Sequence, residues 1–284
     1  MVVIDAQAHV WAAETPQRPW IPDGAKYAHR PLPLGALELL SEMDKAGVDQ
    51  TVLISPTWEG YRNDVVLDAA SMYPDRFRVV IRLAPTRPDL EQALTESWAD
   101  PRVLGVRTVF IRDEKPLLTD GTAERFWTLA ERVGIPVLAF APGKVAVLEQ
   151  AAERHPGLRM VVDHLGIDPR VRDGDVAGHI DTIVRLARLR NVAVKATCLP
   201  NLVTEPYPFP SLHDHVRRVV DAFGPRRVFW GSDLSRLRCA YTEVWALLFE
   251  QLDYLSEEDR ALIAGDALAG WLRRPAADPV GGPR

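Results

Sequence analysis

The chain has 284 residues, of which 47% are hydrophobic and 26% charged, with a formal net charge of −5. This is the profile of a folded globular protein, and no basic run interleaved with aromatic residues suggests nucleic acid as a partner. No apolar stretch reaches the roughly 18 residues that span a membrane, the start lacks the positive segment of a signal peptide, and two cysteines without metal-binding spacing favour a reducing cytoplasm.

Eight short apolar runs follow one another along the chain, each nearly continuous in hydrophobic character. Strands that are buried on both faces of a parallel sheet have this pattern. The runs lie at residues 2–6, 50–55, 78–83, 104–110, 135–140, 159–164, 191–196 and 227–232. Segments with helical spacing lie between them, at 34–46, 65–73, 123–133, 145–155, 176–189 and 212–223. Gly47, Gly134 and Gly224 follow three of these segments, as is typical of helix C-termini.

The alternation of these strands with helices predicts an α/β fold of the (β/α)8 TIM-barrel type. A doubly wound open sheet is the rival, but no glycine-rich nucleotide-binding motif follows any strand. We therefore predict a single-domain barrel over residues 1–272 and a disordered tail, rich in Pro, Gly and Ala, over 273–284. The Pro-rich segment 12–33 is the predicted first β-to-α loop, which would hang over the mouth of the barrel.

Polar side chains end most of the predicted strands, and the carboxyl ends of the strands carry the chemistry of such barrels. The first strand ends in Asp5, Gln7 and His9, which strict alternation would place together on the inward face. Further polar or aromatic candidates near other strand ends are Trp58, Arg107, Arg112, Asp163, His164, Lys195, Cys198, Ser232 and Asp233. Two imidazoles, a carboxylate and two guanidiniums can bind an anionic substrate, polarise its carbonyl and activate a water.

Each of these residues also has a purely structural explanation. Ser232 and Asp233 suit turns or helix N-caps. Lys195 lies inside an apolar run, where a buried ammonium needs partners, and a carboxylate such as Asp5 or Asp163 would supply one. The case for a site therefore depends on the convergence of the set and not on any single member.

Other residues carry weaker signals. Tryptophans near the predicted mouth would suit a planar ring in the substrate, but tryptophan is also a common core residue; they are Trp11, Trp20, Trp58 and Trp230. Cys198 is expected to be a packed side chain, because no histidine is paired with it in the sequence. The histidines outside strands one and six are expected at the surface, with His29 in the first loop within reach of the mouth.

Four motifs, taken in order, resemble the amidohydrolase superfamily. They are IDAQAHVW at 4–11, VVDHLG at 161–166, NVAVKAT at 191–197 and WGSD at 230–233, and together they span most of the chain. The most similar branch contains pyrone-dicarboxylate lactonase, fuconolactonase and metal-dependent decarboxylases of aromatic acids. The resemblance implies a barrel with its site at the carboxyl ends of the strands.

The resemblance also implies roles for particular residues. In the family a first-strand His-x-His motif binds a divalent metal, and His9 matches its second histidine. His164 matches the histidine that ends strand six, and Asp233 matches the strand-eight aspartate that binds metal or handles protons. Lactone-specific members hold carboxylates with arginines around strand four, where Arg107 and Arg112 fall.

The sequence departs from the family pattern at two positions. Gln7 replaces the first histidine, and Phe140 or Ala141 stands where strand five would offer another. Catalytic zinc usually takes three good protein ligands, and an amide oxygen is a poor substitute for imidazole. We therefore expect a site without a tightly bound metal, in which Gln7 forms hydrogen bonds. If Zn2+ or Mn2+ does bind, the expected ligands are His9, His164 and Asp233.

We expect a hydrolase of a small carboxylated cyclic ester, or of a related carbonyl compound, with Asp233 as the general base. The expected helpers are His9 and His164 on the carbonyl, with Gln7, Arg107, Arg112, Trp11, Trp58 and Lys195 around the substrate. A metal-dependent decarboxylase is one alternative, and a barrel that only binds a ligand is another. The expected partner is an anionic small molecule, and a homo-oligomer stays possible.

Overall fold

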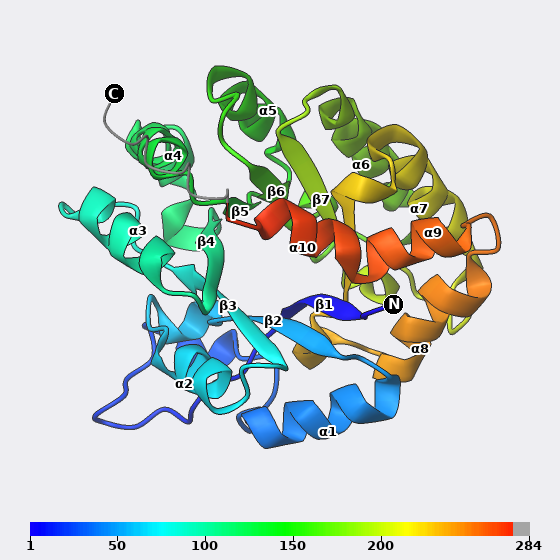
Figure 1. Cartoon of the computed structure of the whole chain (residues 1–284), viewed down its shortest axis with the longest axis horizontal. Coiled ribbons are helices and arrows are strands. Elements are labelled where there is room, and N and C mark those ends of the chain that lie inside the picture. The colour runs from blue at the N-terminus through cyan, green and yellow to red at the C-terminus, as the bar shows by residue number, and fades with distance from the viewer. Residues whose placement is uncertain (275–284) are drawn as a thin grey trace, which may run out of the picture.

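Eight parallel strands follow one another in chain order around a barrel (Figure 1). The computed structural model describes residues 1–274, so most of the expected tail over 273–284 lies outside the described residues. The strands are Ile4–Ala8 (β1), Gln50–Ile54 (β2), Phe77–Arg82 (β3), Val103–Val109 (β4), Val137–Phe140 (β5), Met160–Val162 (β6), Val192–Thr197 (β7) and Val228–Gly231 (β8). The prediction of a (β/α)8 barrel is confirmed.

Helices surround the barrel (Figure 1). They are Ala36–Ala46 (α1), Asp64–Met72 (α2), Leu90–Ala99 (α3), Thr122–Val133 (α4), Val145–Arg154 (α5), Val176–Ile183 (α6), Pro210–Phe223 (α7), Tyr241–Ala246 (α8), Glu257–Ala261 (α9) and Ala267–Leu272 (α10). The helical spacing of the sequence predicts α1, α2 and α4 to α7, but not α3. It also misses α8 to α10, which have only 5 or 6 residues each and are too short to show a helical period.

The barrel closes where the last strand meets the first. The amide of Asp233, just beyond β8, donates a hydrogen bond to the Gln7 carbonyl at 2.9 Å. The Asp5 carboxylate accepts a second one from the Ser232 amide, also at 2.9 Å. These bonds hold Gln7 and Asp233 side by side, although the two residues come from opposite ends of the chain.

Apolar side chains fill the interior of the barrel below its mouth. The layer consists of Ala6, Val52, Ile54, Val80, Leu138, Val161, Ala193 and Phe229, and Leu268 and Leu272 of α10 pack against it. Because α10 contacts this layer, it covers the amino-terminal ends of the strands (Figure 1). A second, larger apolar layer lies between the strands and the outer helices. Polar inward-facing side chains are therefore concentrated near the carboxyl ends of the strands.

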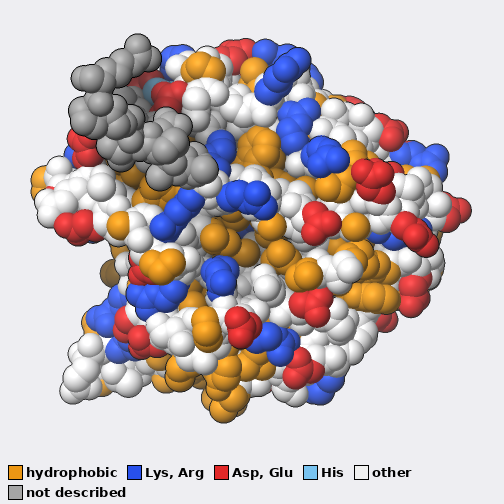
Figure 2. Space-filling view, viewed as in Figure 1, with side chains coloured by type: hydrophobic (Ala, Val, Ile, Leu, Met, Phe, Trp, Pro, Cys, Tyr) orange, Lys and Arg blue, Asp and Glu red, His pale blue; other side chains and the backbone are white. Residues whose placement is uncertain are grey.

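The face that carries α10 mixes basic, acidic and apolar side chains (Figure 2). A hollow between β2, β4 and α10 is lined mainly by apolar side chains such as Leu104, Leu268 and Leu272. No helix within residues 1–274 is both long and apolar enough to cross a membrane.

The first strand contains an irregularity that changes which of its residues face inward. Its pairing with β2 shifts register between Asp5 and Ala8, where β1 carries one extra residue. The Asp5 carboxylate accordingly reaches α8 and accepts a hydrogen bond from the Tyr241 hydroxyl at 2.6 Å. Gln7 and His9 line the cavity at the mouth. The expectation that strict alternation places Asp5 on the same inward face as Gln7 and His9 is therefore wrong.

Candidate active site

A cavity opens at the carboxyl ends of the strands. Its empty volume, open mouth included, is about 370 Å³. Its lining residues are Gln7 and His9 from the end of β1, His29 from the first loop, Thr57 and Trp58 after β2, Arg107, Val109 and Ile111 in and after β4, Phe140 of β5, His164 after β6, and Asp233 and Arg236 after β8. Six of the eight strands thus contribute to one site.

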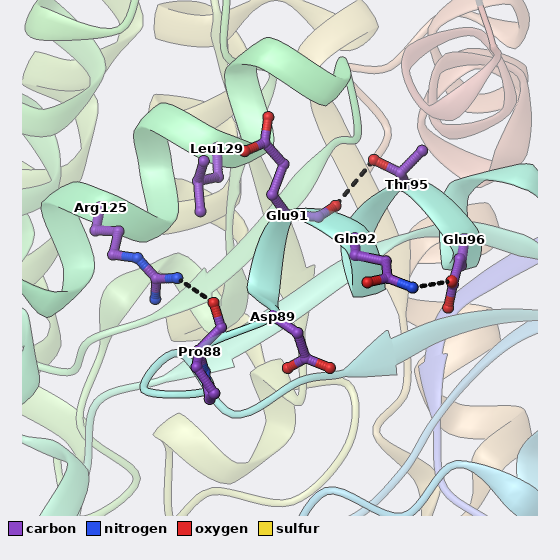
Figure 3. Close-up of a pocket in the computed structure, with 8 residues that line it drawn as sticks. All are labelled: Pro88, Asp89, Glu91, Gln92, Thr95, Glu96, Arg125 and Leu129. Atoms are coloured by element: carbon purple, nitrogen blue, oxygen red, sulfur yellow. Dashed lines mark hydrogen bonds between the residues drawn. The ribbon is translucent and has the colours of Figure 1, made fainter.

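A larger surface hollow, of about 1090 Å³, lies between α3 and α4 (Figure 3). Its polar groups are largely paired with one another: the Gln92 amide donates to Glu96 at 2.8 Å, and Arg125 donates to the Pro88 carbonyl at 3.0 Å. None of its lining residues is a histidine or a cysteine. We place the candidate site at the barrel mouth, where polar side chains converge from several strands.

Asp233 is at the centre of the polar group in the mouth. Its side chain is 1% exposed, with Oδ1 3.2 Å from His9 Nε2 and Oδ2 3.8 Å from His164 Nε2. Burial alone would raise the pKa of Asp233, but its contact with His9 and the nearby histidines hold that pKa well below the ordinary value. The carboxylate is therefore ionised at neutral pH.

The backbone at two of these strand ends has an uncommon conformation. His164 and Asp233 have φ values of 53°, in the left-handed region that residues other than glycine rarely adopt. Cys198, which follows β7, has a φ of 60°. Such conformations cost on the order of 1–3 kcal/mol and are concentrated at functional sites. Here they occur directly after three neighbouring strands and turn His164 and Asp233 toward the cavity.

Gln7 links a buried lysine to His164. The Lys195 ammonium donates to Gln7 Oε1 at 3.1 Å, which directs the Gln7 amide group toward His164 Nε2, also at 3.1 Å. The amide nitrogen of Gln7 only donates, so His164 Nε2 accepts and the ring proton sits on Nδ1, 2.7 Å from Thr197 Oγ1. This arrangement requires a neutral ring, and burial lowers the pKa of His164 to about 4.

A buried group of three charges lies beneath the cavity. Asp163 Oδ2 accepts from Arg107 Nε at 2.6 Å, and its Oδ1 lies 3.2 Å from Lys195 Nζ. Burial would raise the pKa of Asp163, but Lys195 and then Arg107 lower it to about 2. Of the two carboxylates suggested by the sequence as partners of Lys195, Asp163 is therefore the one that pairs with it. The Nε contact fixes the Arg107 guanidinium at the wall of the cavity.

Two basic side chains that line the cavity, His29 and Arg236, were not among the predicted site residues. His29 lies against Trp58 with ring centroids 4.6 Å apart, and its Nδ1 is 2.7 Å from Ser235 Oγ. Arg236 Nε lies 4.0 Å from Asp233 Oδ2. The position of His29 in the long first loop is a usable signal, whereas Arg236 follows the strand-eight motif without any distinguishing pattern.

His155, expected at the surface, is buried between Glu124 and Glu131.

Several residues expected around the substrate lie outside the cavity lining. Trp11 packs edge-on against Trp58, with ring centroids 5.2 Å apart. Lys195 is fully buried behind Gln7. Arg112 stacks on the Tyr27 ring at 3.8 Å and donates to Thr57 at 3.0 Å, which places it at the rim.

Two more of the residues singled out in the sequence also lie away from the cavity lining. Trp230 stacks on Tyr241 of α8, with ring centroids 6.4 Å apart. Cys198 is buried beside the site, and burial raises the pKa of its thiol. A protonated, packed thiol agrees with the expectation that Cys198 is no nucleophile.

The metal ligands expected from the sequence do not form a suitable set. His9 and Asp233 are close together, but the lone pair of His164 Nε2 accepts the hydrogen bond from Gln7, and its Nδ1 carries a proton. A metal ligand needs a free lone pair. Within this hydrogen-bond network, His164 serves Gln7 and not a cation.

A parallel barrel with imidazoles, a buried carboxylate and guanidiniums at the carboxyl ends of its strands belongs to the class of barrel enzymes. The family model described as Amidohydrolase matches residues 4–269. The chain therefore belongs to the amidohydrolase family of enzymes.

Individual relatives agree with this assignment. The chain is 29% identical to an L-fucono-1,5-lactonase of Burkholderia ambifaria, over 97% of each protein. A solved amidohydrolase from Burkholderia multivorans with bound zinc has a TM-score of 0.80 at 20% identity, over 97% of this chain and all of the other. A probable 2-pyrone-4,6-dicarboxylic acid hydrolase from Acinetobacter baumannii, with citric acid bound, has a TM-score of 0.76 at 21% identity, over 96% and 99%. Solved decarboxylases of 5-carboxyvanillate and 2,6-dihydroxybenzoate share the fold at 17% and 15% identity.

Proposed function

We propose that the protein is a lactonase that hydrolyses a small cyclic ester bearing a carboxylate, with Asp233 as the base that activates water. The observation that carries the proposal is the buried, ionised carboxylate of Asp233 at the centre of a cavity that Arg107 and Arg236 also line. Lactone hydrolysis by the fuconolactonase relative supports the reaction class. The two arginines support an acidic substrate.

In the proposed reaction, water attacks the lactone carbonyl carbon while its proton moves to Asp233. Gln7 has a second amide hydrogen besides the one directed at His164, and this hydrogen stabilises the oxyanion that forms on the carbonyl oxygen. Collapse of the tetrahedral intermediate breaks the ring C–O bond, and the leaving alkoxide takes the proton back from Asp233. The product is the open hydroxy acid.

His164 and Lys195 have positioning roles in this proposal. The sequence favoured His164 as a group that polarises the carbonyl, but its Nε2 accepts from Gln7 and has no proton to donate. Lys195 holds Gln7 Oε1 and thereby fixes which end of the amide faces the cavity. The glutamine that replaces the first histidine of the family motif thus has a defined function as an oriented hydrogen-bond donor.

Two alternatives from the sequence can be weighed against this geometry. A metal-dependent decarboxylase would need an ion on His9, His164 and Asp233, and the engagement of His164 with Gln7 disfavours that set. A barrel that only binds a ligand would not need an ionised carboxylate buried among imidazoles. Burying a charge costs desolvation free energy, and ligand binding alone gives no reason to retain it at this position. Hydrolysis is therefore the better supported of the three.

The experiment that tests the proposal is a hydrolysis assay of the purified protein on two sets of lactones. One set contains sugar-acid lactones, and the other contains unsaturated or aromatic lactones with a free carboxylate. Release of acid is followed in a pH-stat or with an indicator dye. We expect hydrolysis in the carboxylated set above that of the matched methyl esters. Failure to hydrolyse any member would refute the proposal.

Arg107→Lys should raise KM for a carboxylated lactone about tenfold or more. The guanidinium Nε is held by Asp163, and no hydrogen bond within residues 1–274 engages its two terminal nitrogens, which are left for the substrate. Losing one hydrogen bond to a charged group costs about 1.5–3 kcal/mol, and 1.4 kcal/mol is tenfold in affinity. Arg112→Lys at the rim is the matched control, with a change of less than about threefold. Equal KM values in the two variants would show that Arg107 does not bind the substrate.

Treatment with a chelator should leave lactone turnover within about twofold of the untreated value. The proposed steps use only Asp233, Gln7 and the arginines, so removal of divalent ions removes none of the reacting groups. Elemental analysis before and after chelation measures the metal content of the protein, and the hydrolysis assay measures the turnover of the same samples. Activity that is abolished by chelation and restored by zinc or manganese would overturn the metal-free mechanism.

A further inference from the structure

We propose that Asn201 selects lactones that carry a ring hydroxyl group, by accepting a hydrogen bond from that hydroxyl in a small chamber beside the main cavity. This inference rests on the proposed function, because it names the kind of lactone that the site would take. The chamber has an empty volume of about 320 Å³, open mouth included. His164 and Arg236 line both the chamber and the main cavity, so the two spaces adjoin.

The orientation of the Asn201 side chain is fixed by the loops after β7 and β8. Asn201 lies on the short 3₁₀ turn Leu199–Leu202, and its backbone amide donates to the Cys198 carbonyl at 3.1 Å. Its side-chain Nδ2 donates to the Arg236 carbonyl at 2.8 Å. Because a carbonyl only accepts, the amide nitrogen must face Arg236, and Oδ1 faces the other way.

The oxygen of this amide is a buried acceptor without a donor. No hydrogen bond reaches Asn201 Oδ1 within residues 1–274. The residue is only 9% exposed, and it lines the chamber. A buried carbonyl oxygen without a hydrogen bond costs free energy unless a water or a ligand supplies the donor. A ligand that brings a donor into the chamber removes this cost, so binding there favours such a ligand.

The Thr197 hydroxyl, which also lines the chamber, offers the complementary group. Its Oγ1 accepts from His164 Nδ1 at 2.7 Å, because the ring proton sits on that nitrogen. The hydroxyl hydrogen of Thr197 has no acceptor in the described part of the chain. A ligand hydroxyl both donates and accepts, so one such group can satisfy Asn201 Oδ1 and Thr197 together.

The other groups around the chamber argue against charged ligand groups. Arg172 and Arg236 both line it, and two guanidiniums disfavour an ammonium group. A carboxylate has no hydrogen to donate to Asn201 Oδ1. Ile167 and Leu202 contribute apolar wall that offers no further partner. A neutral hydroxyl on the lactone ring fits this combination.

Binding of stable ring acids tests the chamber without any turnover. The probes are the 2-, 3- and 4-hydroxycyclohexanecarboxylates, with cyclohexanecarboxylate as the analogue that lacks the hydroxyl, and isothermal titration calorimetry measures their affinities. The wild type should bind the best hydroxy acid about tenfold or more tightly than the unsubstituted acid, because a site built to bond a hydroxyl rejects the analogue without it. Asn201→Leu removes the acceptor and should bring the two affinities within about twofold of each other.

A matched control and a second variant separate acceptance of the hydroxyl from support of the loop. Gln92→Leu, which removes an exposed amide on α3 outside the site, should keep the wild-type ratio of affinities. Asn201→Asp keeps an acceptor oxygen but cannot donate to the Arg236 carbonyl. It should therefore retain the preference for the hydroxy acid. If Asn201 only held the loop, the Asp and Leu variants would lose affinity for both acids alike.

Hydrolysis of paired lactones with and without a ring hydroxyl should show the same preference in kcat/KM. Equal affinity of the wild type for the hydroxylated and unsubstituted acids, or no measurable affinity for either, would show that the chamber holds solvent only and would overturn the inference. A preference that Asn201→Leu retains, or that Asn201→Asp loses, would overturn it too. Absence of lactone hydrolysis, with the hydroxyl preference present in binding, would count against the proposed function alone.

Discussion

Replacing Asp233 with Asn should lower kcat/KM for lactone hydrolysis by about 100-fold or more, the usual scale of general-base catalysis. Asparagine has nearly the same shape but cannot take a proton from water. It also tolerates the left-handed backbone conformation at this position, where φ is 53°. The loss should therefore appear in turnover while the fold is retained.

Steady-state kinetics on the best lactone of the substrate panel measure this effect, with circular dichroism to verify folding. Asp168→Asn is the matched control, because Asp168 pairs with the exposed Arg170 outside the cavity lining. Its kinetics should stay within about twofold of the wild type. If Asp233→Asn retains more than about a third of wild-type kcat/KM, Asp233 is not the base. A wild type that binds carboxylated lactones without hydrolysing them would instead favour a ligand-binding barrel.

The barrel architecture could be predicted from the sequence because strands buried on both faces appear in it as nearly continuous apolar runs. Runs such as 50–55 and 191–196 are almost continuously apolar, and each gave a strand within one or two residues of its observed bounds. Leu90–Ala99 was missed although Leu90, Ala93 and Leu94 have helical spacing and are buried. The short helices after β8 leave no such pattern. Their place is set by packing, with α10 against the barrel interior.

The candidate site could be predicted only in part from the sequence. The order of the strands determines which strand ends meet, but it does not determine the direction of each side chain. Barrel topology brought His9, His164 and Asp233 to one cavity, since each follows a parallel strand. Barrel topology could not show the extra residue in β1. One inserted residue reverses the face of the residues that follow it, so Asp5 does not share a face with Gln7 and His9.

Neither the path of the first loop nor the direction of individual side chains could be predicted from the sequence. The path of a long loop depends on tertiary contacts such as that of His29 with Trp58. The direction of the Gln7 amide depends on Lys195, which lies 188 positions away in the chain. No local pattern encodes either contact, so the hydrogen-bond roles of Gln7 and His164 emerge only in the folded structure.

Asp163→Asn should lower the free energy of unfolding by about 3–5 kcal/mol, the cost of leaving buried charges without their partner. Asp163 and Lys195 are fully buried, and the Arg107 side chain is 5% exposed. The substitution leaves two positive charges facing each other without the carboxylate between them. Urea unfolding monitored by tryptophan fluorescence measures the change. Asp168→Asn, which breaks an exposed ion pair, should cost less than about 1 kcal/mol.

A double variant separates the charge effect from a simple loss of packing. Adding Lys195→Met to Asp163→Asn removes one of the two uncompensated charges and keeps a side chain of similar length. Because replacing buried ionic groups with apolar ones is often neutral or stabilising, the double variant should recover part of the lost stability. It should still hydrolyse the lactone poorly, since Lys195 no longer orients Gln7. A double variant that is less stable than Asp163→Asn alone would show that Lys195 stabilises the barrel independently of Asp163.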